Sequence, residues 1–409
     1  MPKRALCIIG TGFGAFSLIK SIDTDLYAVT VISPRNHFIF TPLLPSTTVG
    51  TIEFRSIIEP IRSAREGIEF VEATCTGIDA DTANIRCRSG KDSPEFTIPF
   101  DLAVIAAGAV ANTYNIPGVS ENALFLRELS DARAIRQRIV ECLERADAPS
   151  VTEEECRRLL QFVIVGGGPT GVEFAAELHD FLKDDLRRAY PKHIENVRII
   201  IVEASDHLLS TFDAALSSYT LKHFLRQNID VRTHTSVKRV DADRVHLSSG
   251  EVLPFGLLVW STGIGPSPLV TALPFEKNAR SRLIVDTFLR IPSRPNLYAI
   301  GDCATLASQN LPATGQVAQQ EGYYLGKSLN RLARGKTVKP YKYRNLGMLA
   351  YIGSNEALAD LEAIKGHGFS TWLFWRSVYL TRLVSWKNKI LVLFDWFKAF
   401  VFGRDVSRF

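Results

Sequence analysis

The sequence contains no closely spaced pair of cysteines. Its six cysteines occur at positions 7, 75, 87, 142, 156 and 303, so none forms a C-x-x-C or C-x-x-x-x-C motif. This spacing argues against a disulfide scaffold and favours a reducing compartment. It also leaves no adjacent redox pair to carry electrons, although a long-range pair such as Cys156 with Cys303 stays open.

The chain also lacks a long apolar run, and its first expected strand lies close to its first residue. No run reaches the roughly 18 apolar residues of a transmembrane helix. The first expected strand, residues 5–9, begins so close to Met1 that we expect no signal or transit peptide. With 409 residues, 46% hydrophobic and 22% charged, the sequence is instead typical of a folded protein of two or three domains.

A glycine-rich fingerprint stands in the middle of the chain, in LQFVIVGGGPTGVE at residues 160–173. A buried strand is expected at 162–165, followed by glycines at 166, 168 and 171 and a helix over 172–181. This G-x-G-x-x-G spacing lets a pyrophosphate rest on the helix N-terminus. The next expected strand, 198–202, ends on Glu203, whose carboxylate can accept hydrogen bonds from a ribose and would repel a 2′-phosphate. The unit therefore favours NADH over NADPH.

A second copy of the fingerprint opens the chain, in ALCIIGTGFGA at residues 5–15. Gly10 and Gly12 fit the motif, and Ala15 occupies its third small position. The expected helix 16–22 and strand 27–32 complete a βαβ unit, but this strand ends on Ser33 instead of an acid. Ser33 can still hydrogen-bond a ribose, and Arg35 could reach a pyrophosphate.

Segments outside the two fingerprints indicate further elements of nucleotide binding. Residues 36–52 indicate a rigid loop lining a pocket, and residues 101–107 a buried strand running into Gly108. Residues 297–304 indicate a strand ending in Gly-Asp, where Asp302 can bind a polyhydroxyl chain such as ribitol. Residues 120–158 are expected to be helical, with a charged, solvated face. Two dinucleotide folds in one chain indicate FAD together with NAD(H).

Two segments indicate where the electrons leave. A helix expected from residue 312 carries Gln316 and Gln320 on one face, where their amides could bind the carbonyl oxygens of an acceptor. Residues 369–409 hold four of the five tryptophans and seven Lys/Arg against two acids, an excess equal to the whole formal net charge of +5. Aromatic residues with flanking cations suit helices lying in the headgroup region of an anionic membrane. A dimer interface or a helix packed on the body of the protein is the alternative, and a nucleic acid partner is not expected.

These motifs together resemble the type II (alternative, non-proton-pumping) NADH:quinone oxidoreductases, most closely the fungal mitochondrial internal branch. The resemblance covers essentially the whole chain: GTGFGA, SPRNHFIFTPLLPS, SIIEP, residues 163–173, VEA at 202–204, AIGD, GQVAQQE, NLGMLAYIGS and a basic-aromatic tail ending in FGRD. Gln316 and Gln320 match the quinone helix of that family, with Gly315 in place of the usual Ala and Gln319 where the fungal enzyme has His. Glu173 matches a family residue near the nicotinamide and flavin.

The resemblance implies a set of site residues. The catalytic residues would be Glu173, Gln316 and Gln320. Non-covalent FAD would contact Gly10, Gly12, Phe13, Gly14, Ala15, Ser33, Pro34, Arg35, Thr41, Pro42, Leu43, Ala107, Gly108, Gly301, Asp302, Gln316 and Val317. NADH would contact Gly166, Gly168, Pro169, Thr170, Gly171, Glu173, Glu203, Thr262 and Gly263. The quinone would contact Gln316, Gln319, Gln320 and Tyr351, and no metal site is expected.

The sequence therefore predicts an α/β protein with two Rossmann-like dinucleotide-binding domains and a C-terminal amphipathic region that associates with a membrane. We expect an FAD domain from residues 1–125 and 280–345, an NADH domain at 126–279, and a membrane-anchoring region at 346–409. The predicted protein is a peripheral enzyme of a bacterial or mitochondrial inner membrane that oxidises NADH and reduces a quinone without pumping protons. A sulfide:quinone or ferredoxin-type reductase and a flavin-binding redox-signalling protein are the alternatives.

Overall fold

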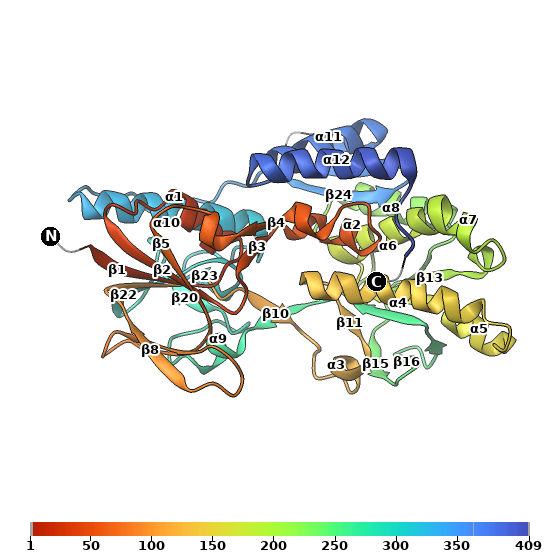
Figure 1. The fold of residues 1–409 in the computed structure, drawn as a ribbon, viewed down its shortest axis with the longest axis horizontal. Helices are drawn as coiled ribbons and strands as arrows, with labels where there is room; N and C mark the ends of the chain where they lie inside the picture. The colour runs from red at the N-terminus through yellow and green to blue at the C-terminus, as the bar shows by residue number, and fades with distance from the viewer. Residues whose placement is uncertain (1–2, 363, 408–409) are drawn as a thin grey trace. The chain divides into compact units, whose positions relative to one another are not determined.

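A computed structural model describes residues 3–362 and 364–407 and divides into two compact units, each built around a parallel sheet (Figure 1). The first unit comprises Met1–Ile39, Ile58–Val110 and Ile264–Asn345, and the second comprises Phe40–Ile57, Ala111–Gly263 and Leu346–Phe409. The two sheets confirm the predicted α/β class with two Rossmann-like folds. Arg408 and Phe409, which belong to the predicted basic tail, lie outside the described residues.

The first unit is organised around a six-stranded sheet with the order β21-β22-β9-β1-β2-β5. Its strands are β1 (Arg4–Ile9), β2 (Tyr27–Ser33), β5 (Ile68–Glu72), β9 (Leu102–Ile105), β21 (Arg290–Ile291) and β22 (Arg294–Ala299). All neighbours are parallel except β21 and β22. Because β1 lies between β2 and β9, the first glycine turn leaves the sheet at its centre, as expected of a dinucleotide fold.

Smaller elements surround this sheet. The strands are β3 (His37–Ile39), β4 (Ile58–Pro60), β6 (Thr74–Asp79), β7 (Asn84–Arg88), β8 (Glu95–Pro99), β10 (Ala109–Ala111), β19 (Ile264–Pro266), β20 (Leu283–Val285) and β23 (Ala304–Leu306). The helices are α1 (Phe13–Ser21), α9 (Pro268–Ala272) and α10 (Gly315–Ala333). Helix α1 starts three residues earlier than the sequence indicates, because Gly12 caps it directly after the turn.

Glycines allow helices α1 and α10 to pack closely. A Cβ atom on Gly322 would lie 2.1 Å from the carbonyl oxygen of Gly14, and one on Gly326 would lie 2.1 Å from Ser21 Oγ. Real Cβ atoms do not approach other atoms so closely, so larger residues at these positions would push the helices apart. This contact fixes α1, and with it the turn that precedes α1.

The second unit is organised around a five-stranded, fully parallel sheet with the order β11-β18-β12-β13-β14. Its strands are β11 (Leu124–Phe125), β12 (Gln161–Val165), β13 (Arg198–Val202), β14 (Asp230–Arg232) and β18 (Leu257–Trp260). The main helices are α2 (Leu44–Thr48), α3 (Val119–Asn122), α4 (Leu129–Ala146), α5 (Glu153–Leu159), α6 (Pro169–Phe181), α7 (Arg187–Ala189) and α8 (Ala214–Arg226). Between α6 and α7 the chain forms a π-helix, Leu182–Leu186.

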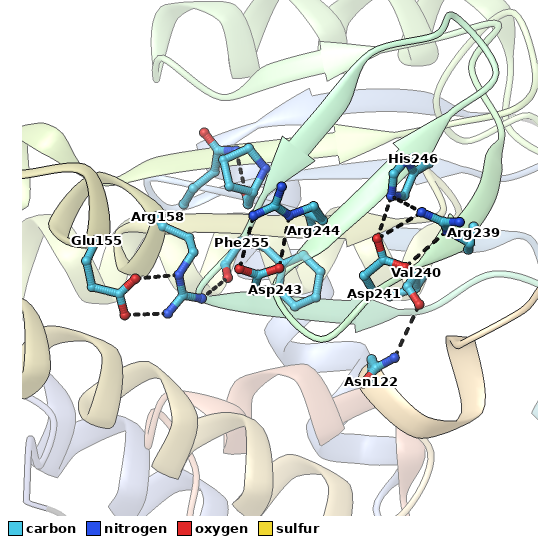
Figure 2. Close-up of polar contacts among 12 residues, drawn as sticks. Asn122, Glu155, Arg158, Arg239, Val240, Asp241, Asp243, Arg244, His246 and Phe255 are labelled. Atoms are coloured by element: carbon cyan, nitrogen blue, oxygen red, sulfur yellow. Dashed lines mark hydrogen bonds and ion pairs between the residues drawn. The ribbon is translucent and has the colours of Figure 1, made fainter.

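A small antiparallel sheet of β15 (Val237–Val240), β16 (Arg244–Leu247) and β17 (Val252–Pro254) extends this unit. Figure 2 shows its polar contacts: Asn122 donates to the carbonyl oxygen of Val240 at 3.2 Å, and Arg158 donates to the carbonyl oxygen of Phe255 at 2.7 Å. Arg158 also pairs with Glu155 at 2.6 Å and is only 15% exposed. Part of the charged stretch 120–158 is therefore buried instead of solvated, because Arg158 joins α5 to the segment that follows the small sheet.

The prediction of a rigid loop at residues 36–52 is partly wrong. The structure forms β3, a 3-10 turn at Thr41–Leu43 and the short helix α2 there. Every residue of α2 is buried. Pro42 and Pro45 each stand in the first turn of one of these short helices, where a missing N–H costs no hydrogen bond. The prolines that suggested a loop start helices instead.

The C-terminal segment forms a three-stranded antiparallel sheet and two helices (Figure 1). These elements are β24 (Met348–Gly353), β25 (Glu356–Asp360), β26 (Lys365–Gly368), α11 (Phe369–Arg382) and α12 (Trp386–Phe402). The Arg376 guanidinium lies 4.1 Å from the ring centre of Trp372 and 4.6 Å from that of Trp396, which joins α11 to α12. None of the helices in the described part of the chain has the length and apolar character needed to cross a bilayer.

We expect Gly322→Ala to lower the free energy of unfolding of the first unit by about 1–3 kcal/mol, because the added methyl group collides with the α1 backbone. The neighbouring exposed variant Tyr323→Ala should change it by less than about 0.5 kcal/mol. Thermal unfolding of both variants, with amide hydrogen exchange in α1 and α10, measures the difference. Equal stability of the two variants would show that the helix contact is not tight.

Candidate functional site

The first glycine turn has the geometry of a phosphate cradle. Gly10 has φ +114°, and a Cβ there would lie 2.2 Å from the carbonyl oxygen of Ala106. Gly12 caps α1 without a side-chain hydrogen bond, and nothing lies within 4 Å of the place its Cβ would occupy. Open space therefore lies beside the N-terminus of α1, where the positive end of the helix dipole favours an anion.

Ser33, which ends β2, is buried and hydrogen-bonded. Its Oγ lies 3.3 Å from Thr11 Oγ1 and accepts from the backbone N–H of Arg35 at 3.2 Å. The Arg35 guanidinium donates to the carbonyl oxygen of His37 at 3.0 Å. Ser33 thus links the glycine turn to the end of β2.

The Gly301–Asp302 turn is held by a residue that sequence reasoning missed. The backbone N–H of Gly301 donates to Glu321 Oε2 at 2.6 Å, and Glu321 is 3% exposed. Burial raises the pKa of Glu321 to about 7, against the opposing effects of this hydrogen bond and of the Arg282 charge. The acid that ends the GQVAQQE motif, Glu321, is the feature of the sequence that could have indicated this contact.

The predicted glutamines lie on the first turns of α10, in the same unit as this Gly-Asp turn. Tyr343 donates to Gln316 Oε1 at 2.7 Å. The amide of Gln320 is engaged by one backbone residue, donating to the Arg344 carbonyl at 2.8 Å and accepting from the Arg344 N–H at 3.0 Å. Gln319 accepts from Ser17 Oγ through its carbonyl at 2.7 Å, which links α10 to α1.

The second glycine turn repeats the cradle in the other unit. Gly166 also has φ +114°, and a Cβ on Gly171 would lie 2.0 Å from the Gly166 carbonyl oxygen. Gly168 caps α6 with open space around it, and Pro169 occupies the first helical turn. Thr262 lies against Gly166, where a Cβ would meet it at 2.9 Å. Helix α6 starts at Pro169, three residues before its expected start.

Glu203 stands at the end of β13 beside this turn, as predicted. Its Oε2 accepts from the Gly167 N–H at 2.5 Å, and its Oε1 accepts from the N–H and Oγ of Ser205, each at 2.7 Å. The carboxylate is half-buried, and its negative charge lies next to the glycine turn. This position suits a carboxylate that receives hydrogen bonds from a ribose diol.

Glu173 lies one turn into α6 and is almost completely buried. It accepts from the Tyr351 N–H at 3.1 Å, and burial raises its pKa to about 8. The Tyr351 hydroxyl donates to Asp180, and Glu177 accepts from Ser46 at 2.6 Å and Thr51 at 2.7 Å. Sequence reasoning missed Glu177 and Asp180, although their spacing from Glu173 places all three on one helix face.

The predicted site residues are divided between the two units. The first unit holds the following FAD and quinone residues: Gly10, Gly12, Phe13, Gly14, Ala15, Ser33, Pro34, Arg35, Ala107, Gly108, Gly301, Asp302, Gln316, Val317, Gln319 and Gln320. The second unit holds the NADH residues Gly166, Gly168, Pro169, Thr170, Gly171, Glu173, Glu203, Thr262 and Gly263, together with Thr41, Pro42, Leu43 and Tyr351.

The six cysteines are free thiols, and all but the partly exposed Cys156 are buried. Burial raises the pKa of Cys303 to about 12, and its Sγ donates to the carbonyl oxygen of Ile105 at 3.4 Å. A neutral, buried thiol is a poor nucleophile. The thiols therefore do not have the character of a redox-active pair.

Comparison with protein families matches nearly the whole chain. Residues 4–322 match the family described as pyridine nucleotide-disulphide oxidoreductase, and residues 345–405 match the NDH2 C-terminal domain. A probable NADH dehydrogenase of Dictyostelium discoideum is 47% identical, with 100% of this chain and 92% of that protein covered. An internal alternative NAD(P)H-ubiquinone oxidoreductase A1 of Solanum tuberosum mitochondria is 41% identical, with 99% and 88% covered.

Solved structures agree with these matches. The structure of NDH2 from Plasmodium falciparum in complex with NADH has a TM-score of 0.95 and 28% identity, and 99% of this chain and 100% of that chain are covered. A sulfide:quinone oxidoreductase of Aquifex aeolicus shares the fold with a TM-score of 0.73 but only 19% identity, over 98% and 96% of the two chains. The chain therefore belongs to the pyridine nucleotide-disulphide oxidoreductase family and, within it, to the type II NADH:quinone oxidoreductases with an NDH2 C-terminal domain.

Proposed function

We propose that the protein oxidises NADH and reduces a membrane quinone through bound FAD, without pumping protons. The observation that carries this proposal is the presence of two open glycine turns, one in each unit, of which only the second has an acid at the end of its ribose strand. The relatives named as NADH dehydrogenase and NAD(P)H-ubiquinone oxidoreductase support the same reaction.

We assign FAD to residues 1–125 and 280–345, and NADH to residues 126–279. The residues present fit FAD, because the Gly12 cap is open and Gly108, with φ +64°, also has free space at its Cβ position. The pyrophosphate would rest on the N-terminus of α1, and Asp302 would bind the ribitol. FAD, when bound, accepts a hydride from NADH and gives two electrons to the quinone.

The protein residues supply alignment and a dry site rather than a nucleophile. We assign the nicotinamide nucleotide to the Gly166–Gly171 turn, Thr262, Gly263 and Glu203, with Glu173 near the nicotinamide. We assign the quinone to Gln316, Gln319, Gln320 and Tyr351. A sulfide:quinone or ferredoxin-type reductase is the competing reaction class, and the buried character of Cys303 disfavours the first. A flavin-binding signalling protein is the competing non-enzymatic role.

The function is tested by the two half-reactions measured separately. Anaerobic NADH should bleach the flavin absorbance, and a short-chain ubiquinone should restore it within the time of catalytic turnover. In Gln316→Leu, which removes the amide beside Tyr343, the recovery should slow by about tenfold while bleaching keeps its rate.

Gln309→Leu, an exposed glutamine of the same unit, serves as the matched control and should leave both rates unchanged. Bleaching without recovery in the wild-type protein would favour the signalling role. A loss confined to the bleaching step in Gln316→Leu would remove this residue from the quinone site.

Cofactor preference should depend on Glu203. Glu203→Ala removes a charged acceptor worth about 1.5–3 kcal/mol, so the ratio of kcat/KM for NADH over NADPH should fall about tenfold or more. Glu203→Gln keeps hydrogen-bonding groups but removes the charge, so it should mainly relieve the exclusion of NADPH. Steady-state kinetics with both nucleotides decides this, and an unchanged ratio in both variants would refute the assignment of Glu203.

Attachment to a membrane surface is supported by the orientation of α12. Two of its polar residues are buried against the protein: Asp395 accepts from Ser56 Oγ at 2.6 Å and from the Glu53 N–H at 3.0 Å, and Asn388 donates to the Ser56 carbonyl at 2.9 Å. Its outer surface carries the exposed Lys387 but is mainly apolar, with the exposed residues Trp386, Ile390, Leu393, Phe394, Phe397, Phe400, Val401 and Phe402. Monomeric soluble proteins rarely expose so large an apolar patch. We propose that this surface lies in the headgroup region of an anionic inner membrane.

Phe397→Glu combined with Phe400→Glu should release the protein from liposomes. Both side chains are more than half exposed. Each substitution removes an apolar side chain whose burial in the membrane contributes about 25 cal/mol per Å² to the binding free energy. Each also introduces a carboxylate that an anionic surface repels. Co-sedimentation with anionic liposomes at low and high salt measures the loss, which should persist at high salt because the apolar term is not screened. Leu225→Glu, an exposed leucine on α8, should bind like the wild type. Unchanged sedimentation of the double variant, with a change in oligomeric state, would make this surface a homodimer interface instead.

A further inference from the structure

Arg282 is a buried arginine that directly precedes β20 in the first unit, and it is 8% exposed. Strand β20 runs parallel to β23, with Leu283 opposite Ala304. Because β23 directly follows the short helix Gly301–Cys303, this pairing places Arg282 beside the Gly301–Asp302 turn. An arginine is rarely buried in this way unless it has a charged partner.

The turn that carries Arg282 is held by hydrogen bonds. The Asn278 side chain accepts from the backbone N–H groups of Arg280 and Arg282, each at 3.0 Å. The Asn278 N–H in turn donates to the carbonyl oxygen of Arg282 at 2.9 Å. Ser281, between the two arginines, has φ +57°, which these bonds hold in place. The backbone of Arg282 is therefore fixed, whereas Arg280, two residues away, is exposed.

The guanidinium of Arg282 reaches the segment that leads into α10. Its Nη1 donates to the carbonyl oxygen of Leu311 at 2.8 Å, and α10 begins at Gly315. Its Nε is buried and has no hydrogen-bond partner in the described part of the chain. A buried donor without a partner is uncommon and calls for an explanation. The single bond to Leu311 therefore does not account for this buried cation.

Two acids and this cation gather at the Gly301–Asp302 turn. Burial lowers the pKa of Arg282, and the charges of the nearby Asp302 and Glu321 oppose that effect. Glu321 accepts from the Gly301 N–H at 2.6 Å, and Asp302 is the residue assigned to the ribitol. Both acids thus have a task at the turn, and together they bring negative charge to it. Arg282 keeps its charge at any physiological pH and offsets theirs.

We propose that Arg282 is a positioning residue for flavin reduction: it offsets the acids of the Gly301–Asp302 turn and thereby raises the reduction potential of the FAD bound there. The inference rests on the proposed function, which assigns FAD to this unit. Hydride transfer from NADH adds two electrons and one proton to the neutral oxidised flavin, so the reduced flavin carries a negative charge and NAD⁺ is released. Unopposed carboxylates nearby would disfavour that reduced form.

The test compares Arg282→Gln, which keeps a donor for the Leu311 carbonyl but removes the charge, with Arg282→Lys, which keeps the charge. The full-length protein with bound FAD is reduced slowly in equilibrium with a redox dye of known potential. In Arg282→Gln the equilibrium constant for flavin reduction should fall about tenfold, which is about 30 mV for a two-electron couple. Arg282→Lys should stay within about twofold of the wild type.

Arg280→Gln is the matched control, since it removes an exposed, screened charge from the same turn and should leave the potential unchanged. The affinity for oxidised FAD, measured by the flavin fluorescence released on dilution, separates charge from structure. It should change little in Arg282→Gln. A loss of this affinity with an unchanged potential would show that Arg282 only supports the fold, and would overturn the proposal. Equal shifts of potential in Arg282→Gln and Arg282→Lys would overturn it as well.

A further variant tests the charges of the turn if Arg282→Gln does not fold. Glu321→Gln keeps an acceptor for the Gly301 N–H and removes a negative charge that Arg282 offsets. Since burial raises the pKa of Glu321 to about 7, this acid is mostly ionised at pH 8, and the variant should have a higher potential there. An unchanged potential would overturn the proposal. A wild-type protein that binds no FAD, or whose flavin NADH does not reduce, would instead overturn the proposed function.

Discussion

The close approach of backbone to backbone at the glycine turns is the constraint on which both nucleotide folds depend. Gly10 and Gly171 would each place a Cβ about 2 Å from a carbonyl oxygen, that of Ala106 after β9 and that of Gly166 respectively. A side chain at Gly10 would push the first turn away from the end of β9, and one at Gly171 would push α6 away from the second turn. The same closeness leaves the N-termini of α1 and α6 free of side-chain caps. In the first unit, the glycines of α10 hold α1 from the other side. A network of tight contacts without side chains thus creates the space that a dinucleotide needs.

On α12, Asp395 and Asn388 are buried while most of the exposed residues are apolar, which reverses the usual pattern of a surface helix. Asp395 and Asn388 of α12 satisfy backbone and hydroxyl groups around Ser56, and Arg404 reaches Asp185 and Thr51. Because these buried polar groups are paired, they fix where the helices attach. The segment is therefore an integral part of the second unit, and its Tyr351 and Trp375 line the same cavity as Glu177 and Asp180 of α6.

The parts of the protein that follow from short-range rules could be predicted from the sequence. Strand β13 has the predicted bounds, and Glu203 stands at its end because strand length and the position of the acid are both local properties. Helix starts were predicted three residues too late, since glycine caps do not interrupt the apolar pattern on which the estimate relied. The helix α2 was missed because prolines indicate turns unless their place in a first helical turn is recognised.

Contacts between distant segments could not be predicted. Glu321 binds the Gly301 N–H across twenty residues, and Tyr351 reaches Asp180 across more than 170. Nothing in the local pattern distinguishes Glu177 from an ordinary surface acid, because its burial depends on α2 and on the C-terminal segment packing around it. Asp395 and Lys398 lie in an apolar stretch of the sequence, and their partners Ser56 and Glu53 lie more than 300 residues away.

The packing of Arg376 between Trp372 and Trp396 has a consequence for the fluorescence of the protein. Trp372, Trp375 and Trp396 are buried around this cation, whereas Trp386 at the start of α12 is 79% exposed. Trp260, the fifth tryptophan, is buried in the core of the second unit. The intrinsic fluorescence of the protein therefore comes from one solvent-exposed tryptophan, Trp386, and four buried ones. The emission wavelength of Trp386 therefore reports the polarity around α12 without any added label.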